Sequence, residues 1–198
     1  MRNKVLVAML ATAGLLSAPV VQAEEGVFMV RARALYVDFS NGQNNLPINV
    51  EADNRWIPEV DFSYFITPNI AAELVLTTPQ SVDIKNDGTK LGSVRALPPS
   101  LLLQYHVTEL GAFKPYVGLG LNYTIFSSRN VGTTARVDSS SLGLAAQVGA
   151  DYMLDKNWGI NADLKYIQMD TKVKAGGSSI GTLDLNPITV GAGVTYRF

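Results

Sequence analysis

Along most of this chain, apolar and polar residues alternate at every second position, which is the pattern of a β-strand with two different faces. In the last such segment, Val194 and Tyr196 lie on one face, whereas Thr195 and Arg197 lie on the other. Eight segments alternate in this way, and we expect each to be a strand. They are Val27–Phe39, Arg55–Ile66, Ile70–Thr78, Arg95–Val107, Pro115–Phe126, Ser141–Met153, Trp158–Asp170 and Ile188–Phe198.

The connections between these segments alternate in length. Three are short: Thr67–Asn69, Thr108–Lys114 and Leu154–Asn157. Four are long and rich in residues that favour turns and disorder: Ser40–Asn54, Pro79–Gly92, Ser127–Ser140 and Thr171–Asn186. Short periplasmic turns that alternate with longer extracellular loops are typical of outer-membrane proteins. The sequence therefore predicts an all-β fold, an eight-stranded antiparallel up-and-down transmembrane β-barrel.

A soluble β-sandwich or a lipocalin-like barrel would also alternate, but these folds bury their apolar face inside. Here the other face carries many charges: Arg31, Arg33, Glu59, Asp61, Glu73, Asp163, Lys165 and Arg197. So many charges do not fit one small closed core without water. Aromatic residues near the segment ends resemble the girdles at the two membrane interfaces. They are Tyr36, Trp56, Tyr64, Tyr105, Tyr116, Tyr152, Trp158, Tyr166 and Tyr196.

The first 23 residues have the features of a secretory signal peptide. Arg2 and Lys4 precede an apolar run from Val5 to Leu16, and Val21-Gln22-Ala23 resembles a cleavage site. The alternative is a membrane anchor, but the run has about twelve residues, against the roughly 20 that a span needs. We therefore expect cleavage after Ala23, a barrel over residues 24–198, and the bacterial outer membrane as the location.

Composition excludes several functional classes. Cysteine is absent, so the chain has no disulfide, thiolate metal site or cysteine nucleophile. The formal net charge is −1 and no basic block occurs, which argues against a nucleic-acid partner. We expect neither a metal nor another cofactor.

Five blocks of the sequence, in combination, resemble the OmpW family of small outer-membrane proteins. They are TPNIAAELVLTTP (67–79), LPPSLLLQYH (97–106), KPYVGLGLNYTIF (114–126), AAQVGADYMLDKNW (145–158) and LDLNPITVGAGVTYRF (183–198). The terminal GVTYRF, with Tyr196 and Phe198, also resembles the signal that the barrel-assembly machinery recognises in such proteins. The four long loops match least.

The resemblance implies a passive channel, not an enzyme, that takes up small hydrophobic molecules across the outer membrane. Some members of the family are proposed to release them sideways into outer-membrane lipid. The family also includes receptors for phages or colicins and surface proteins that contact a host. A receptor barrel that acts through its loops is therefore the alternative function.

The inner face of an eight-stranded barrel is only wide enough for side chains or one small ligand. Along the strands, its charged residues come on the periplasmic side and its apolar residues toward the extracellular side. Together with the resemblance, this gradient predicts a polar plug: Arg31, Arg33, Glu59, Asp61, Glu73, Asp163 and Lys165. Above it we expect a hydrophobic funnel lined by Leu35, Val37, Val75, Leu102, Phe126, Ile167 and Met169. The alternative is a barrel that transports nothing, whose inward polar side chains only pair with one another.

Two prolines, Pro98 and Pro99, stand at the extracellular start of the fourth segment. Proline donates no backbone hydrogen bond, so these residues weaken strand pairing. One interpretation is a lateral opening through which a hydrophobic solute reaches the bilayer. The other is that the prolines end the preceding loop above the membrane.

Other candidate sites have simpler interpretations. A barrel enzyme would place a histidine, a serine and a carboxylate on its lipid face. The single histidine, His106, falls on the inner face, and Ser100 is six residues away on the same strand. Asp83 and Asp87 could bind Ca²⁺ in a loop. The inward glycines, Gly118, Gly120, Gly143 and Gly149, are expected to relieve crowding and allow curvature.

Overall fold

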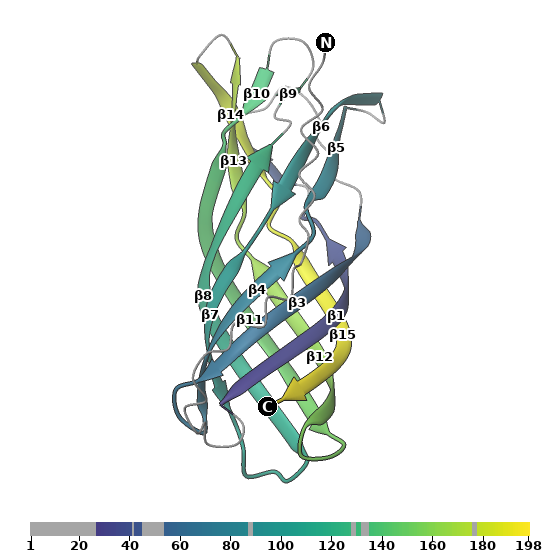
Figure 1. Cartoon of the computed structure of the whole chain (residues 1–198). Coiled ribbons are helices and arrows are strands. Elements are labelled where there is room, and N and C mark those ends of the chain that lie inside the picture. Colours follow the sequence, from purple (N-terminus) through teal and green to yellow (C-terminus); the bar gives the residue numbers. More distant parts are fainter. Residues whose placement is uncertain are drawn as a thin grey trace, which may run out of the picture.

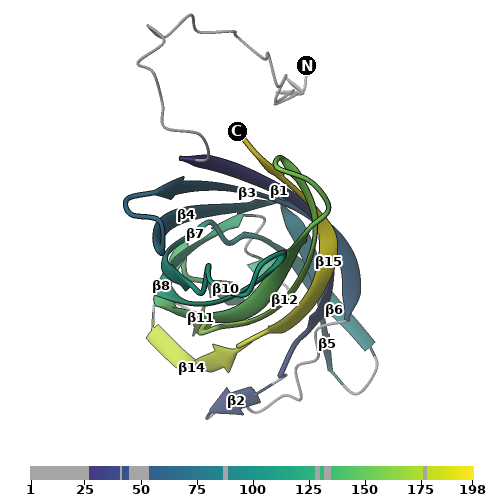
Figure 2. The same ribbon diagram turned by 90° about the horizontal axis from the view of Figure 1, so that it is seen from below.

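The computed structural model describes residues 27–40, 42–44, 54–86, 89–127, 130–131, 135–175 and 178–198. The predicted signal peptide, residues 1–23, lies outside this part. Eight strands form the barrel wall: β1 (Phe28–Asp38), β3 (Arg55–Phe65), β4 (Ile70–Thr77), β7 (Ser100–His106), β8 (Phe113–Ser127), β11 (Ser140–Met153), β12 (Trp158–Ile167) and β15 (Ile188–Arg197). Each pairs antiparallel with the next, and β15 closes the ring by pairing with β1 (Figures 1 and 2). The predicted barrel is confirmed.

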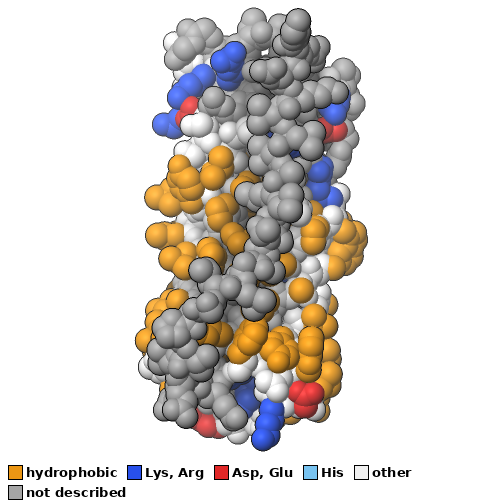
Figure 3. Space-filling model, in the orientation of Figure 1, with side chains coloured by type: hydrophobic (Ala, Val, Ile, Leu, Met, Phe, Trp, Pro, Cys, Tyr) orange, Lys and Arg blue, Asp and Glu red, His pale blue; other side chains and the backbone are white. Residues whose placement is uncertain are grey.

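The alternation in the sequence separates the two faces of this wall. In β7, Leu101 and Leu103 are 59% and 56% exposed, whereas Leu102 between them is 2% exposed. A shift of one residue in register would exchange the faces, so the burial of one set fixes the pairing. In Figure 3, hydrophobic side chains form a broad band, and most charged side chains of this view lie beyond its two ends. No helix in the described part of the chain is long and apolar enough to span a membrane.

Aromatic residues mark both ends of the band. Trp158 contacts Tyr196, which in turn contacts Phe198, at the end where the chain terminates. Tyr36 and Trp56 pack together toward the opposite end of β1 and β3. We predicted Tyr116 as a member of the girdle, and this is wrong. It is 2% exposed and points into the barrel, because it lies at an inward position of its strand.

In the described part of the chain, seven further strands lie beyond the band, at the opposite end from the C-terminus (Figure 1). They are β2 (Gly42–Asn44), β5 (Gln80–Asn86), β6 (Thr89–Leu97), β9 (Asn130–Val131), β10 (Ala135–Val137), β13 (Asp170–Ala175) and β14 (Ser178–Asp184). The long connections were expected to favour turns and disorder, so strand pairing there is a correction. These segments form strands because backbone pairing continues beyond the band and apolar residues at alternate positions are buried. Examples are Val94, Val137, Val173 and Leu183.

The short connections are turns held by side chains. In the turn after β11, the backbone N–H groups of Trp158 and Asn157 donate to Asp155 Oδ1 at 2.7 and 2.8 Å. These bonds stabilise the charged form and hold the pKa of the Asp155 carboxyl below its usual range. In the turn after β3, Asn69 Nδ2 donates to the carbonyl of His106 at 2.8 Å and so ties two turns together.

Candidate channel and its lateral window

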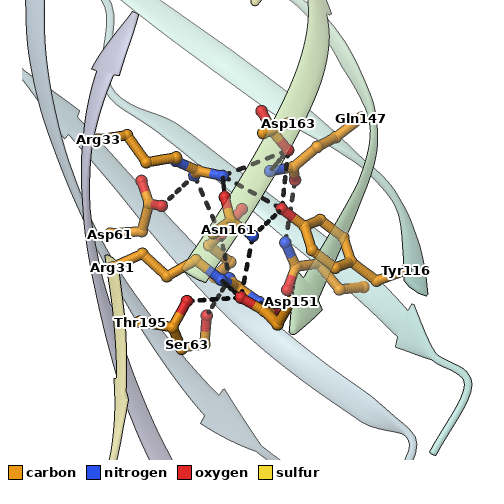
Figure 4. Close-up of polar contacts among 12 residues, drawn as sticks. Arg31, Arg33, Asp61, Ser63, Tyr116, Gln147, Asp151, Asn161, Asp163 and Thr195 are labelled. Carbon is orange, nitrogen blue, oxygen red and sulfur yellow. Dashed lines mark hydrogen bonds and ion pairs between the residues drawn. The ribbon is translucent and has the colours of Figure 1, made fainter. Parts of the chain in front are cut away.

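The lower half of the barrel interior is filled by a network of buried charges, in which all seven residues of the predicted plug take part. Arg31 Nη1 lies 2.9 Å from Glu73 Oε1, and Arg31 Nη2 lies 2.7 Å from Asp151 Oδ2. Asp151 was not among the predicted plug residues, although its position on the inner face could have suggested it. Thr195 Oγ1 donates to Asp151 as well, at 2.5 Å (Figure 4).

Arg33 is the second centre of the network. It forms ion pairs with Glu59 at 3.0 Å, with Asp163 at 3.3 Å and with Asp61. Lys165 Nζ lies 3.0 and 3.1 Å from the two carboxylate oxygens of Glu59. Three cations thus face five carboxylates, all at least 96% buried. We refer to these eight residues as the plug: Arg31, Arg33, Glu59, Asp61, Glu73, Asp151, Asp163 and Lys165.

Tyr116 links the charges, and we did not predict this role. Its hydroxyl donates to Asp163 Oδ2 at 2.9 Å and accepts from Arg33 Nη1 and Asn161 Nδ2, both at 3.1 Å (Figure 4). The signal that could have revealed it is its spacing of two from Gly118 on the inner face. Tyr116 also stacks on His106, with the ring centroids 5.0 Å apart.

Gly149 makes room for this tyrosine. A Cβ atom at position 149 would lie 2.4 Å from Tyr116 Oη and 2.5 Å from its Cζ. We therefore expect Gly149→Ala to lower the free energy of unfolding by about 1–3 kcal/mol, the usual cost of overpacking. Urea unfolding in lipid vesicles measures the loss. The matched control is Gly118→Ala, where a Cβ would meet only glutamine side-chain atoms at 3.1–3.6 Å. Equal losses in both variants would contradict this explanation.

Above the plug, an apolar pocket occupies the extracellular half of the barrel. Its empty volume is about 480 Å³, including space that opens to solvent. Five of the seven predicted funnel residues line it, and Leu102 and Phe126 belong to the same buried apolar cluster. We call this cavity the upper pocket. Its lining consists of Leu35, Val37, Phe39, Ile57, Glu59, Val75, Thr77, Gln80, Ala96, Pro98, Ile167, Met169, Pro187 and Thr189.

Strand pairing is interrupted beside this pocket. The ladder between β4 and β7 ends at the pair Val75–Ser100, and the ladder between β5 and β6 begins at Gln80–Ala96. Between these two pairs, no residue of the segment 76–79 is paired in a ladder with a residue of the segment 97–99. We call this interval the window. It contains three prolines, at positions 79, 98 and 99, none of which can donate a backbone hydrogen bond.

The prolines lie between β6 and β7, directly before Ser100, the first residue of β7. On the other side of the window, β8 pairs with β6 above the prolines and with β7 below them. The N–H of Tyr123 on β8 donates to the carbonyl of Pro99 at 3.0 Å, so the backbone of Pro99 faces β8. Asn122 Nδ2, also on β8, donates to the carbonyls of Pro98 and Pro99 at 3.2 and 3.1 Å, so both carbonyls are bonded from β8, and neither proline has an N–H to offer the window.

The window lies at the upper edge of the apolar band. Leu76, on one side of it, is 40% exposed, and Ile125, which pairs with Leu97, is 44% exposed. Arg95, two residues above Leu97, is exposed and is the first charge beyond the window on this strand. Pro98 is buried and lines the upper pocket. The window therefore separates the pocket from the region of the lipid tails.

The other candidate residues that the structure describes, His106 and Asp83, lie in separate environments. His106 is buried between Phe65 and Tyr116, and its Nε2 lies 2.9 Å from Gln104 Oε1, away from the lipid face. Asp83 forms an ion pair with Lys90 at 2.9 Å, whereas Asp87 lies outside the described residues. Within the described ranges, no three His, Asp or Glu side chains are grouped so that they could hold a metal ion.

Comparison with known proteins supports this architecture. The model of the OmpW family matches residues 24–198. Outer membrane protein W of Vibrio cholerae is 36% identical, over 94% of this chain and 95% of that protein. The dibenzothiophene metabolism operon protein PahQ of Pseudomonas aeruginosa is 27% identical, over 67% of this chain and 65% of that protein. The crystal structure of the outer membrane protein OprG from P. aeruginosa matches with a TM-score of 0.75 and 28% identity, over 88% of this chain and 97% of that chain.

Proposed function

Because the chain belongs to the OmpW family of outer-membrane barrels, we propose that it is a passive channel for small hydrophobic molecules. The upper pocket is the observation that carries this proposal. Ten of its fourteen lining residues are apolar, and it lies above the plug in the extracellular half of the barrel. A relative named for a dibenzothiophene metabolism operon supports the same class of solute, since dibenzothiophene is an apolar aromatic compound.

The plug blocks the passage of an apolar solute along the barrel axis. A solute that enters the upper pocket meets Glu59, which is buried and paired with both Arg33 and Lys165. An apolar molecule cannot replace these charge interactions, and breaking a buried ion pair costs several kcal/mol. The route of lower free energy leads sideways, through the wall.

We propose that the window is this lateral exit. Unpaired backbone groups are costly in lipid unless protein or a ligand shields them, so a gap in the ladder at the apolar band needs a compensating role. The window joins the upper pocket to lipid at Pro98, whose side chain lines the pocket. Tyr196 and Phe198 are proposed to act in assembly, since they pack together at the end of the closing strand, where Phe198 is 60% exposed.

The two prolines provide a test of lateral release. The double variant Pro98→Ala, Pro99→Ala restores two backbone donors beside the window, and we expect it to narrow the opening and slow uptake about threefold to tenfold, for an added barrier near 1 kcal/mol. Pro68→Ala, in the exposed turn after β3, is the control, and uptake should stay within about twofold. The readout is uptake of the tracer 1-N-phenylnaphthylamine by intact cells of a complemented deletion strain. Equal rates in both variants would argue for exit by another route.

A further inference from the structure

The lining of the upper pocket is not uniformly apolar, and its polar members are concentrated next to the plug. Glu59 lines the pocket and pairs with Lys165. In the strand register, Thr77 lies opposite Glu59 and Thr189 lies opposite Lys165. Opposed residues on one face of a sheet hold their Cβ atoms about 4.5–5.5 Å apart. The two threonines thus flank the Glu59–Lys165 pair at the inner end of the pocket.

The hydroxyls of both threonines are buried and make no hydrogen bond to the protein. Thr77 Oγ1 and Thr189 Oγ1 are each without a partner, and the Thr189 side chain is 97% buried. A buried hydroxyl without a hydrogen bond is costly, and most such groups in native proteins have a partner. Since both residues line the pocket, a ligand in the pocket is in position to supply one.

The charges of the plug restrict which polar group this can be. The plug holds three cations and five carboxylates, and Glu59 is the one that lines the pocket. A carboxylate head group would approach this excess of negative charge and would lose its own hydration. A neutral hydroxyl or carbonyl accepts or donates hydrogen bonds without that penalty.

From this arrangement we propose that the channel prefers amphiphiles with an apolar body and one neutral hydrogen-bonding head, such as long-chain alcohols, over pure hydrocarbons and over fatty acid anions. The head group binds Thr77 and Thr189 at the inner end, and the tail occupies the apolar part of the pocket toward Pro98. This inference rests on the proposed function, because it uses the same pocket as the solute site.

The test compares 1-decanol, decane and decanoate on the barrel in lipid nanodiscs. Shifts of the pocket methyl NMR signals, including those of Val37 and Val75, report binding. The double variant Thr77→Val, Thr189→Val keeps the shape of both side chains but removes both hydroxyls. Each compound enters the lipid to the same extent for every variant, so the ratio of dissociation constants between variant and wild type reports the pocket alone.

We expect the double variant to bind 1-decanol about tenfold more weakly than the wild type, the effect of losing two hydrogen bonds. Decane should bind equally well to both proteins, and decanoate should bind the wild type more weakly than 1-decanol does. Thr171→Val is the matched control, because Thr171 Oγ1 is also buried without a partner but does not line the pocket. It should leave all three affinities unchanged.

The outcomes separate the two proposals. If all three compounds bind and the double variant weakens none of them, the head-group preference is wrong and the hydrophobic channel stands. If decanoate binds the wild type as tightly as 1-decanol, the charge argument is wrong. If no compound shifts the pocket methyl signals of the wild type, the pocket is not a solute site and the proposed function itself fails.

Discussion

Arg33→Met is expected to lower the free energy of unfolding by about 3–5 kcal/mol, the loss that follows when one partner is removed from a buried ion pair. Arg33 forms ion pairs with four carboxylates, those of Glu59, Asp61, Glu73 and Asp163, and its side chain is completely buried. Methionine fills a similar volume but leaves the plug with two cations against five carboxylates. The measurement is urea unfolding in lipid vesicles. Both tryptophans, Trp56 and Trp158, lie on the lipid face, so their fluorescence reports loss of the inserted barrel.

A second substitution identifies the cause of this loss. Asp61 loses its ion-pair partner in the Arg33→Met variant, and its Oδ1 has no hydrogen-bond partner. Adding Asp61→Asn to that variant therefore removes a buried negative charge that no cation neutralises. We expect it to restore about 0.5–3 kcal/mol, the usual size of coupling between contacting residues. The control is Arg136→Met, an exposed arginine of β10, which should change stability by less than about 0.5 kcal/mol. An Arg33→Met barrel as stable as this control would show that the plug is not held by charge pairing.

The face on which each side chain lies could be predicted from the sequence, because a strand has a fixed period of two residues. This period places Arg31 and Arg33 inside and Leu101 and Leu103 outside without any knowledge of the pairing. Our assignment of Tyr116 to the girdle failed because it relied on residue type. The period alone would have placed this tyrosine inside.

The partners inside the barrel could not be predicted in this way. Arg31 and Asp151 are 120 positions apart and meet because the strands tilt and stagger around the ring. No local pattern encodes this stagger, so the sequence predicted a set of plug residues but not which of them pair. The upper pocket depends on the same stagger, which brings Val37, Val75 and Ile167 from three strands together.

The window shows a similar limit. Proline in a strand indicates a missing donor, but the sequence does not reveal which neighbour the donor would have faced. The bonds from Tyr123 to Pro99, and from the Asn122 side chain to both proline carbonyls, show that these carbonyls are bonded from β8. The strands that extend the wall were missed because their polar outward residues resemble those of loops. Only the alternate buried positions, such as Val137 and Val173, distinguish them.

Val37→Trp is expected to reduce uptake of an apolar tracer more than tenfold while the barrel remains folded. Val37 lines the upper pocket, and an indole there occupies space that the solute needs. Each methylene displaced from an apolar site costs about 0.8 kcal/mol, so displacing two raises the barrier enough for a rate change of about tenfold. The tracer is 1-N-phenylnaphthylamine, measured with intact cells of the complemented deletion strain.

Val190→Trp is the matched control for the obstruction of the upper pocket by Val37→Trp. Val190 lies on β15, one position from Thr189, which pairs with Val37, and it is 54% exposed on the lipid face. The same indole is therefore introduced at nearly the same height, but outside the wall. We expect normal uptake from Val190→Trp, and the heat-dependent gel mobility of a folded barrel from both variants. If Val37→Trp is folded and still admits the tracer at the wild-type rate, the solute does not pass through the upper pocket. A surface role for the strands beyond the band would then be the better explanation of what this barrel does.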